Sequence, residues 1–530
     1  MSEQNPKAIR GNLAASIGRN TFFGVVARMA QVSTRLVTVP VVIAHLSLGG
    51  YGIWSILMTT AAYMRFGSIG VKSAFQKYVA EATGNGNFET TNKLLSTGCA
   101  VMLVLSLAGL LPIAFFSREL ATLAGVPPEF LISAAHSFTV LAVIMVIANA
   151  GAVYEAIVMG GHRVDLARNF STFFTVAEAV AIVTLLHFGG GLFAMACVMA
   201  ASEVGFIASC YVASKKIVPQ IELKVRHVSK SVVRELLRFG GSYQLANILQ
   251  VLYMSIVPVT ILRIFGADSS GVYALANRLS GSALMLPDAL VVPILSGAAM
   301  VFAAGSAVEI RMLINKSFKV TLALALFPLL FIAFFGPKIV FAWTGESSSS
   351  LPIAFWLVCA AGLFQSFSTL SLVLYRASGL VLLDNIRLVS QIAILLGIAV
   401  AAHALGFYGV LAGLAFAELF GMVFMLFALT KAFEVFRVQS LLNDAMRLVS
   451  AIAIVFLAGA LTLLLPLPAI ANPRLAATVQ LAIVSVVCLI AAWPALALTK
   501  SLSATESKAM MSVFLSRRAR PVGDPIESAS

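Results

Sequence analysis

Long runs of apolar residues, separated by short polar joints, recur along almost the whole chain. A bilayer core about 30 Å thick needs roughly 20 apolar residues in one helix, and fourteen runs are long enough to cross it. The joints carry helix breakers such as Gly49-Gly50 and Pro127-Pro128. The pattern predicts an all-α polytopic membrane protein with about 14 transmembrane helices. The expected spans are 20–46, 50–72, 94–116, 130–159, 169–188, 190–213, 239–265, 271–302, 317–343, 350–378, 385–403, 408–430, 446–470 and 474–499.

The composition indicates that lipid, and not water, surrounds most of this chain. Apolar residues make up 60% of it and charged residues only 11%, whereas a soluble domain carries about 25% charged residues. The polar first 18 residues lack the apolar core and cleavage site of a signal peptide. We therefore expect the first span to act as its own insertion signal. All five cysteines fall inside apolar runs and form no Cys-x-x-Cys pair, which indicates free thiols.

Basic residues are distributed very unevenly between the two sets of loops. Of the 36 Lys and Arg residues, 28 lie before or at the start of the first span, in alternate loops or in the C-terminal tail. By the positive-inside rule, both termini and these loops are expected in the cytoplasm. The longest cytoplasmic connection, 214–238, holds seven basic residues and ends in an amphipathic stretch. This pattern favours a segment that lies on the anionic lipid surface of the inner leaflet. The net charge of +14 thus indicates contact with membrane lipids and no role in binding nucleic acid.

Weak matches recur in the same order along the chain, at a slowly drifting offset of 215–222 residues. This offset covers six helices, so the two halves have the same orientation, and a substrate site is expected between them. The pattern predicts two parallel-repeat six-helix lobes plus two C-terminal helices. The matched residues include Tyr154 with Tyr375, Asp165 with Asp384, His187 with His403, Glu203 with Glu418 and Gly205 with Gly421.

These boundaries predict six parts. They are a cytoplasmic N-terminus (1–18), a first lobe of spans 1–6 (19–213), the basic linker (214–238), a second lobe of spans 7–12 (239–431), spans 13–14 (432–499) and a cytoplasmic tail (500–530).

Four arginines lie well inside predicted spans and away from their ends, where each costs about 2.5–3.5 kcal/mol on insertion scales. Arg28 and Arg35 are seven residues apart, so they lie within about 20° of one another on a helix, and Gln31 is close to the same line. Arg65 and Arg278 lie nearer to span ends, where an arginine can also extend towards the surface. We take these five residues as candidate substrate-binding residues, because guanidinium groups favour phosphate and carboxylate anions.

Buried acids give these arginines an alternative role. Glu178 or Glu203 can pair with an arginine as an internal strut, and Glu178 can also relay protons. Glu203 and Glu418 are duplicated between the halves, which favours a shared packing or hydrogen-bonding role. Signatures of enzymes, metal sites and nucleotide-binding loops are missing from the sequence. We therefore expect a protein that is not an enzyme and that uses no cofactor and no metal.

Two segments resemble a known family of exporters. Residues 48–55 (Leu-Gly-Gly-Tyr-Gly-Ile-Trp-Ser), continuing through Tyr63 and Gly70 to 76–81 (Gln-Lys-Tyr-Val-Ala-Glu), look like the second-span signature of Wzx-like polysaccharide flippases. Residues 273–279 resemble the matching element of the second lobe. The likeness in spacing covers essentially the whole chain. This family belongs to the multidrug/oligosaccharidyl-lipid/polysaccharide (MOP) export superfamily, which also includes lipid II flippases and cation-coupled drug exporters.

The resemblance implies a V-shaped pair of six-helix lobes that works by alternating access. The implied substrate is an oligosaccharide linked to polyprenyl pyrophosphate, moved across the bacterial cytoplasmic (inner) membrane, with envelope polysaccharide assembly proteins as further partners. Arginines on spans 1, 2 and 8 are functional in the flippase branches, and Arg28, Arg35, Arg65 and Arg278 occupy matching spans here. Residues 68–69 and 253–258 lack acids that many relatives carry, which argues against a cation site at those places.

Three other functions fit parts of the pattern. A cation-coupled multidrug exporter of the same superfamily has the same architecture, but cationic drugs favour carboxylates over the arginines of span 1. A membrane glycan polymerase or ligase generally needs a sizeable external loop, and the longest one here covers only about 117–129. A scaffold for envelope synthesis would not explain a cationic stripe deep in span 1.

Overall fold

The structure is a computed structural model, and its described residues are almost entirely helical, with short turns between long helices. No strand occurs among them. The structure describes residues 30, 33–34, 36–61, 66–289, 291, 294, 298, 301, 307–378, 382–432, 438–462 and 471–499.

The helices follow one another along the chain with few intervening residues. A helix over Leu36–Ala61 precedes the labelled elements. These are α2 (Phe66–Asn85), α3 (Phe88–Phe115), α4 (Ser117–Leu123), α5 (Pro128–Gly160), α6 (Val164–His187), α7 (Leu192–Ile217), the 3₁₀ turn η1 (Val225–His227), α8 (Lys230–Asp288), α10 (Ala307–Thr344), α11 (Leu351–Ser378), α12 (Leu382–Val400), α13 (Ala402–Ala432), α14 (Val438–Thr462) and α15 (Pro473–Leu498).

Among the described residues, eleven helices are long and apolar enough to cross a membrane. Two of them cover parts of two predicted spans, because the helix Leu36–Ala61 turns at Ser47 and α8 breaks at Gly266. The shorter apolar helix Met446–Thr462 matches the thirteenth predicted span. The prediction of an all-α polytopic membrane protein is confirmed.

Turns with a left-handed residue recur at matching places in the two halves. Ser47 and Gly266, Gly125 and Gly345, and Gly189 and Gly406 all have φ between 66° and 85°. The members of these pairs are 217–220 residues apart, in agreement with the offset seen in the sequence. The same helix pairs also pack in each half: α3–α5, α5–α7 and α6–α7 correspond to α10–α11, α11–α13 and α12–α13. The fold therefore contains the predicted internal repeat.

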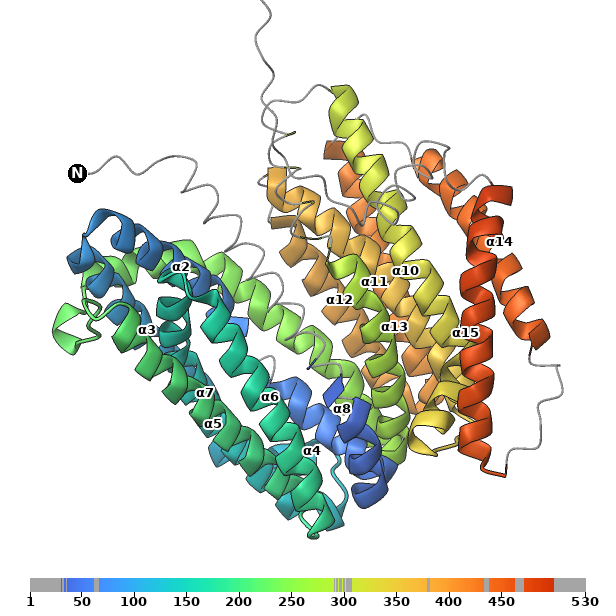
Figure 1. The fold of residues 1–530 in the computed structure, drawn as a ribbon, viewed down its shortest axis with the longest axis horizontal. Coiled ribbons are helices and arrows are strands. Elements are labelled where there is room, and N and C mark those ends of the chain that lie inside the picture. Colours follow the sequence, from blue (N-terminus) through green and yellow to red (C-terminus); the bar gives the residue numbers. More distant parts are fainter. Residues whose placement is uncertain are drawn as a thin grey trace, which may run out of the picture.

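Figure 1 shows how the two halves are arranged. The helices up to α7 form one group, which we call the first lobe, and α10–α13 with the second half of α8 form the other, the second lobe. The groups meet at the bottom of Figure 1 and diverge towards the top. Helices α14 and α15 pack together and against α10 (Figure 1), where Phe456 of α14 contacts Phe331 and Phe335.

The lobes touch closely at the end that carries Gly266, which we call the Gly266 end. A methyl group on Gly52 would lie 2.5 Å from the amide nitrogen of Gly271, and one on Gly271 would lie 2.3 Å from the carbonyl oxygen of Leu48. Gly52 and Gly271 are 219 residues apart, the same spacing as Ser47 and Gly266. The contact thus pairs equivalent positions across the axis of the repeat, as an isologous interface does.

A second inter-lobe contact at the same end depends on a proline. Pro40 has no N–H, so the carbonyl of Leu36 has no partner four residues later in its own helix. The indole Nε1 of Trp343, in α10 of the second lobe, donates a hydrogen bond of 2.7 Å to that carbonyl. Arg474 at the start of α15 donates in turn to the carbonyl of Trp343 at 2.8 Å. Helix α15 is therefore tied to the contact that joins the lobes.

The linker at the opposite end, which we call the linker end, is docked on the first lobe. The Asn92 side chain bonds to the carbonyl of Gln220 and to the amide of Glu222, and Thr97 accepts from the amide of Ser229. The amphipathic stretch 231–238 forms the first turns of α8, which begins at Lys230, and its expected place on the membrane surface stays a prediction. No residue in 230–239 breaks a helix, so the stretch continues into the seventh span.

Candidate functional site

A cavity of about 670 Å³ lies in the first lobe and reaches the second lobe. We call it the first-lobe cavity. The helix Leu36–Ala61, α5, α6 and α7 supply most of its wall, and α8 supplies the rest. Hydroxyl, thioether and apolar side chains predominate, so a ligand would meet few charges. The uncharged lining is Thr34, Thr38, Val39, Val42, Tyr51, Trp54, Ser55, Met58, Thr59, Ala61, Ile144, Met145, Thr175, Ala179, Ile182, Met195, Met199 and Met254.

Three charged residues line this cavity among those described: Glu178 on α6, Glu203 on α7 and Arg278 on α8. Arg278 is twelve residues beyond Gly266. At 1.5 Å per residue this is about 18 Å from the Gly266 end, near the middle of a 30 Å bilayer core. The sequence placed Arg278 nearer to the outer surface. In the structure it is half-buried in the wall of a cavity between the lobes.

The other four candidate binding residues lie outside the described part of the chain. Arg28, Gln31, Arg35 and Arg65 therefore stay predictions. Their neighbourhood on the first span is partly described, because Thr34 and Thr38 line the first-lobe cavity.

A second cavity, of about 290 Å³, lies in the second lobe and adjoins the first. We call it the second-lobe cavity, and both cavities share the lining residues Ser55, Thr59 and Met254. Its wall contains many groups that donate or accept hydrogen bonds, and its acids are Asp288 and Glu418. The polar residues that line it are Ser55, Thr59, Tyr253, Ser270, Tyr273, Asn277, Ser280, Asp288, Gln365 and Glu418.

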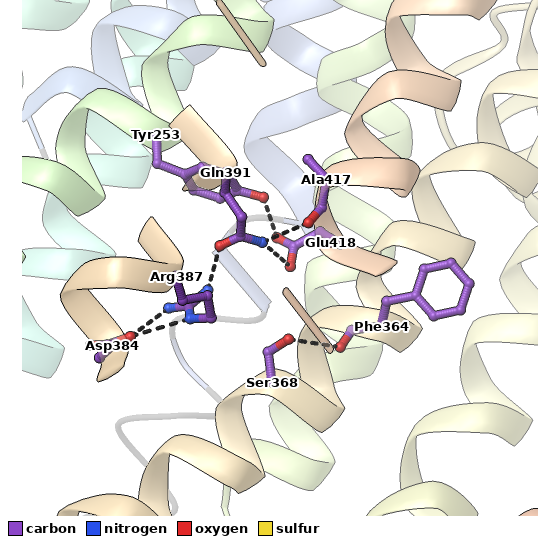
Figure 2. Close-up of polar contacts among 8 residues, drawn as sticks. All are labelled: Tyr253, Phe364, Ser368, Asp384, Arg387, Gln391, Ala417 and Glu418. Carbon is purple, nitrogen blue, oxygen red and sulfur yellow. Dashed lines mark hydrogen bonds and ion pairs between the residues drawn. The ribbon is translucent and has the colours of Figure 1, made fainter. Parts of the chain in front are cut away.

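A buried polar network extends from the second-lobe cavity into the lobe (Figure 2). The hydroxyl of Tyr253 on α8 donates to Oε1 of Glu418 on α13. Nε2 of Gln391 on α12 donates to Oε2 of Glu418 at 3.3 Å. One helical turn earlier on α12, Nη1 of Arg387 donates to Oε1 of Gln391 at 2.6 Å. Arg387 also forms a buried ion pair with Asp384, at 2.7 Å.

Sequence reasoning missed most of this network. We counted Arg387 among the basic residues of a cytoplasmic loop, yet it is 8% exposed and paired inside the lobe. A signal was present, because Asp384, Arg387 and Gln391 follow one another at spacings of three and four and thus lie on one face of a helix. Glu418 forms hydrogen bonds, one of the two roles expected for it and Glu203 together, and a role shared with Glu203 stays a prediction.

The described members of this network lie on α8, α12 and α13, and the surroundings of the duplicated glutamates differ. Gly205 faces the ring of Phe174 in the first lobe, while Gly421 faces the side-chain amide of Gln391 in the second. Residues 174 and 391 thus occupy equivalent places in the repeat. The phenyl ring of Phe174 cannot form the hydrogen bonds that the amide of Gln391 forms, so the environment of Glu203 differs from that of Glu418.

Comparison with solved structures identifies the fold. The chain is similar to an inward-facing multidrug resistance MATE family transporter of the MOP superfamily, with a TM-score of 0.64, 15% identity, and 76% of this chain and 95% of that one covered. It is similar to the lipid II flippase MurJ in an inward closed conformation, with a TM-score of 0.61 and 14% identity, and the match covers 89% of this chain and 97% of that one. An outward-facing MATE family transporter gives a TM-score of 0.54 at 16% identity, with 79% and 96% covered. A comparison with curated proteins gave no significant match.

The repeat, the two lobes and the cavities between them define a multi-pass membrane protein with the fold of MOP-superfamily transporters. Within that class, residues 17–300 match the family described as polysaccharide biosynthesis protein, which is more than half of the chain. The chain belongs to this family.

Proposed function

We propose that the protein moves polyprenyl-pyrophosphate-linked oligosaccharides from the inner to the outer leaflet of the bacterial cytoplasmic membrane. The observation that carries this proposal is the position of Arg278. A chain of the polysaccharide biosynthesis family places a guanidinium group at mid-membrane depth, on one lobe, in the wall of a cavity formed mainly by the other. A pyrophosphate held there would contact both lobes.

The chemistry of the lining suits such a substrate. A guanidinium group binds phosphate oxygens with two parallel hydrogen bonds. The hydroxyls of Thr34, Thr38, Ser55 and Thr59 can bond to sugar hydroxyls. We expect Arg28, Gln31, Arg35 and Arg65 to add further groups that bind the anion, as their positions in the sequence indicate.

We assign the linker end to the cytoplasm, because the basic loops gather there. The lobes diverge at that end (Figure 1) and touch at the Gly266 end. The proposed state is therefore open to the cytoplasm, and it would load substrate from the inner leaflet. Opening at the Gly266 end would release substrate outside.

Transport in proteoliposomes tests the role of Arg278. The probe is a short polyprenyl pyrophosphate carrying a fluorescent disaccharide, and its appearance outside is read with an impermeant quencher. Loss of a hydrogen bond to a charged group costs about 1.5–3 kcal/mol, so Arg278→Ala should slow transport by roughly ten- to a hundredfold. Arg278→Lys keeps the charge without the planar fork and should be intermediate. Arg28→Ala and Arg35→Ala should also lose transport.

The control variant is Arg118→Ala, since Arg118 is exposed on α4 and lines neither cavity. Normal transport by Arg278→Ala, with the control also normal, would contradict the proposed site.

A second candidate, a cation-coupled multidrug exporter, draws support from the two acids in the same cavity. Glu178 and Glu203 line it together with Arg278, and carboxylates favour cationic substrates. Efflux of a cationic dye from the same proteoliposomes separates the candidates. A drug exporter should lose dye efflux in Glu203→Gln and keep it in Arg278→Ala, whereas a glycan carrier should show no dye efflux in either variant.

A further inference from the structure

Two histidines that are far apart in the sequence lie side by side at the Gly266 end of the first lobe. His45 lies two residues before the turn at Ser47, and His187 is the last residue of α6. Their ring centres are 5.6 Å apart, with an angle of 52° between the ring planes. Both side chains are exposed. Because each histidine occurs singly in the sequence, no short motif marks the pair.

The distance between the two rings fits coordination of one shared metal ion. A metal–nitrogen bond of about 2.0–2.1 Å and a tetrahedral angle at the metal place the centres of two ligating imidazoles about 5 Å apart. The observed distance between the ring centres of His45 and His187 is slightly larger, at 5.6 Å. Since both side chains are exposed, small rotations of the rings are enough to close the difference.

A hydrogen bond gives His45 the tautomer that a metal ligand needs. Nδ1 of His45 lies 2.8 Å from the carbonyl oxygen of Val41. A carbonyl oxygen only accepts, so Nδ1 donates and carries the hydrogen. Nε2 therefore keeps its lone pair for a metal. Metal-binding histidines almost always donate their other ring N–H to a carbonyl, a carboxylate or water in this way, which fixes the orientation of the ring.

The internal repeat shows that packing alone does not require imidazole rings at this place. The corresponding turns of the second lobe lie at Gly266 and Gly406. Phe265 and Phe407, beside these turns, have their ring centres 6.1 Å apart. Two phenyl rings thus make the equivalent contact without any nitrogen. The histidines of the first lobe add two metal ligands to a contact that the fold can make with apolar rings.

We propose that His45 and His187 form a binding site for one divalent transition-metal ion such as Zn²⁺. Imidazole nitrogens suit Zn²⁺, Ni²⁺ and Cu²⁺, whereas Mg²⁺ prefers oxygen ligands. No group of three His, Cys, Asp or Glu side chains that could hold a metal occurs among the described residues, so water completes the coordination. A structural zinc site has four protein ligands. An ion held by two exchanges more readily, which suits a site that responds to metal in the surrounding solution.

A metal bound at this pair would stabilise the contact between the lobes at the Gly266 end. It would join the end of α6 to the turn that precedes residues 48–52, which touch α8. A methyl group on Gly49 would lie 2.9 Å from Cβ of Ala267, and one on Gly52 would lie 2.5 Å from the amide nitrogen of Gly271. A turn that is already ordered loses less conformational entropy when it packs against α8, so bound metal should favour the closed Gly266 end.

Isothermal titration calorimetry with Zn²⁺ on the purified full chain tests the site without any substrate. The protein is purified without a histidine tag and in a background without the five native cysteines, so that no thiol competes for the metal. We expect one Zn²⁺ to bind per chain and Mg²⁺ to give no binding heat. Loss even of an outer-shell partner weakens metal binding by roughly 10- to 100-fold, so His45→Phe or His187→Phe should weaken it at least as much.

Phenylalanine is the substitution of choice because the second lobe has phenyl rings at the equivalent contact, so the variants keep the packing of the fold. His136→Phe is the matched control, since His136 is an exposed histidine of the same lobe whose ring contacts Phe193. It should leave the affinity for Zn²⁺ unchanged. An unchanged affinity in the double variant His45→Phe with His187→Phe would overturn the proposed site.

Hydrogen exchange measured by mass spectrometry tests the effect of the metal on the turn. Saturating Zn²⁺ should slow exchange of the backbone amides in residues 46–53 when both histidines are present. The same amides should exchange at an unchanged rate in the double variant His45→Phe with His187→Phe. Binding of Zn²⁺ without slower exchange in 46–53 would overturn the stabilising effect on the Gly266 end. Neither measurement depends on which substrate the protein transports.

Discussion

Arg387 lies inside the second lobe with its guanidinium group shared between Asp384 and Gln391. Such a pair is stable only while both partners are present, because removal of one leaves the other charge buried and uncompensated. We predict that Arg387→Met lowers stability by about 3–5 kcal/mol. The double variant Arg387→Met with Asp384→Leu should recover part of that loss. Thermal unfolding of the purified protein in detergent measures both, and equal melting temperatures for the single and double variants would contradict the prediction.

Gly421 allows the Gln391 amide to lie against α13. A methyl group at residue 421 would lie 2.5 Å from Nε2 of Gln391, which also bonds to Glu418 and Ala417. We predict that Gly421→Ala lowers the melting temperature, because the amide must move and lose bonds. Gly397→Ala on α12 is the control, since a methyl group there meets nothing within 4 Å. Alanine at an open helical position should stabilise by up to about 1 kcal/mol. A higher melting temperature for both Gly421→Ala and Gly397→Ala would show that the Gln391 amide is not fixed in its position.

Single residues were the hardest part to predict from the sequence. Insertion cost identified Arg278, and the structure places it in a cavity wall. The same reasoning assigned Arg387 to a loop, because Arg387 lies near the end of an apolar run and its partners were not considered. Tyr253 carries no charge, so nothing local marked it. Its role depends on α8 and α13 meeting in space, which the sequence does not reveal.

Among the elements, the helix Leu36–Ala61 and α10 are joined by a hydrogen bond that a proline makes available. Trp343 donates to the carbonyl of Leu36, which Pro40 leaves without a helical partner. We predict that Trp343→Phe favours the state open at the Gly266 end, because it removes the donor and keeps an aromatic ring. Loss of this hydrogen bond, about 1 kcal/mol, should shift the ratio of the state open at the Gly266 end to the state closed there roughly fivefold.

The readout for Trp343→Phe is a cysteine at Thr59, which lines both cavities, in a background without the five native cysteines. An impermeant thiol reagent added from the Gly266 end should label it faster in the variant. Trp356→Phe on α11 serves as the control, since Trp356 is partly exposed and packs on Phe334. Equal labelling rates in Trp343→Phe and Trp356→Phe would show that the hydrogen bond of Trp343 does not hold the lobes together.

Helices were well predicted, since apolar length and Gly or Pro breakers act locally. The break at Gly266 and the turn at Ser47 fall between the spans that the sequence separated. The start of α8 was predicted less well, because an amphipathic stretch suits a membrane surface and a helix alike. The docking of 218–229 on α3 depends on side chains such as Asn92 and Ser96, whose partners are about 130 residues away in the chain.

At the scale of the whole molecule, the repeat explains why the lobes close at one end. Equivalent residues Gly52 and Gly271 meet across the repeat axis, and no side chain fits between them. The offset of matched residues predicted two lobes of the same orientation, since an even number of helices separates the halves. It did not predict which end would be closed, because both ends of each lobe carry similar turns.

The orientation of the molecule in the membrane can be tested with two exposed positions at opposite ends. Val225 in the linker is 90% exposed, and Glu119 on α4 is exposed near the Gly266 end. Because the linker end carries most of the basic residues, we predict that Val225→Cys reacts with an impermeant thiol reagent only in inside-out vesicles, and Glu119→Cys only in right-side-out vesicles. A cysteine in place of Thr59 should then be labelled in the same vesicles as Val225→Cys, because the Gly266 end is closed and water reaches the cavities from the linker end. Labelling of Val225→Cys in right-side-out vesicles would reverse the proposed direction of transport. If the cysteine at residue 59 were instead labelled only in right-side-out vesicles, like Glu119→Cys, the contacts at the Gly266 end would not close the cavity.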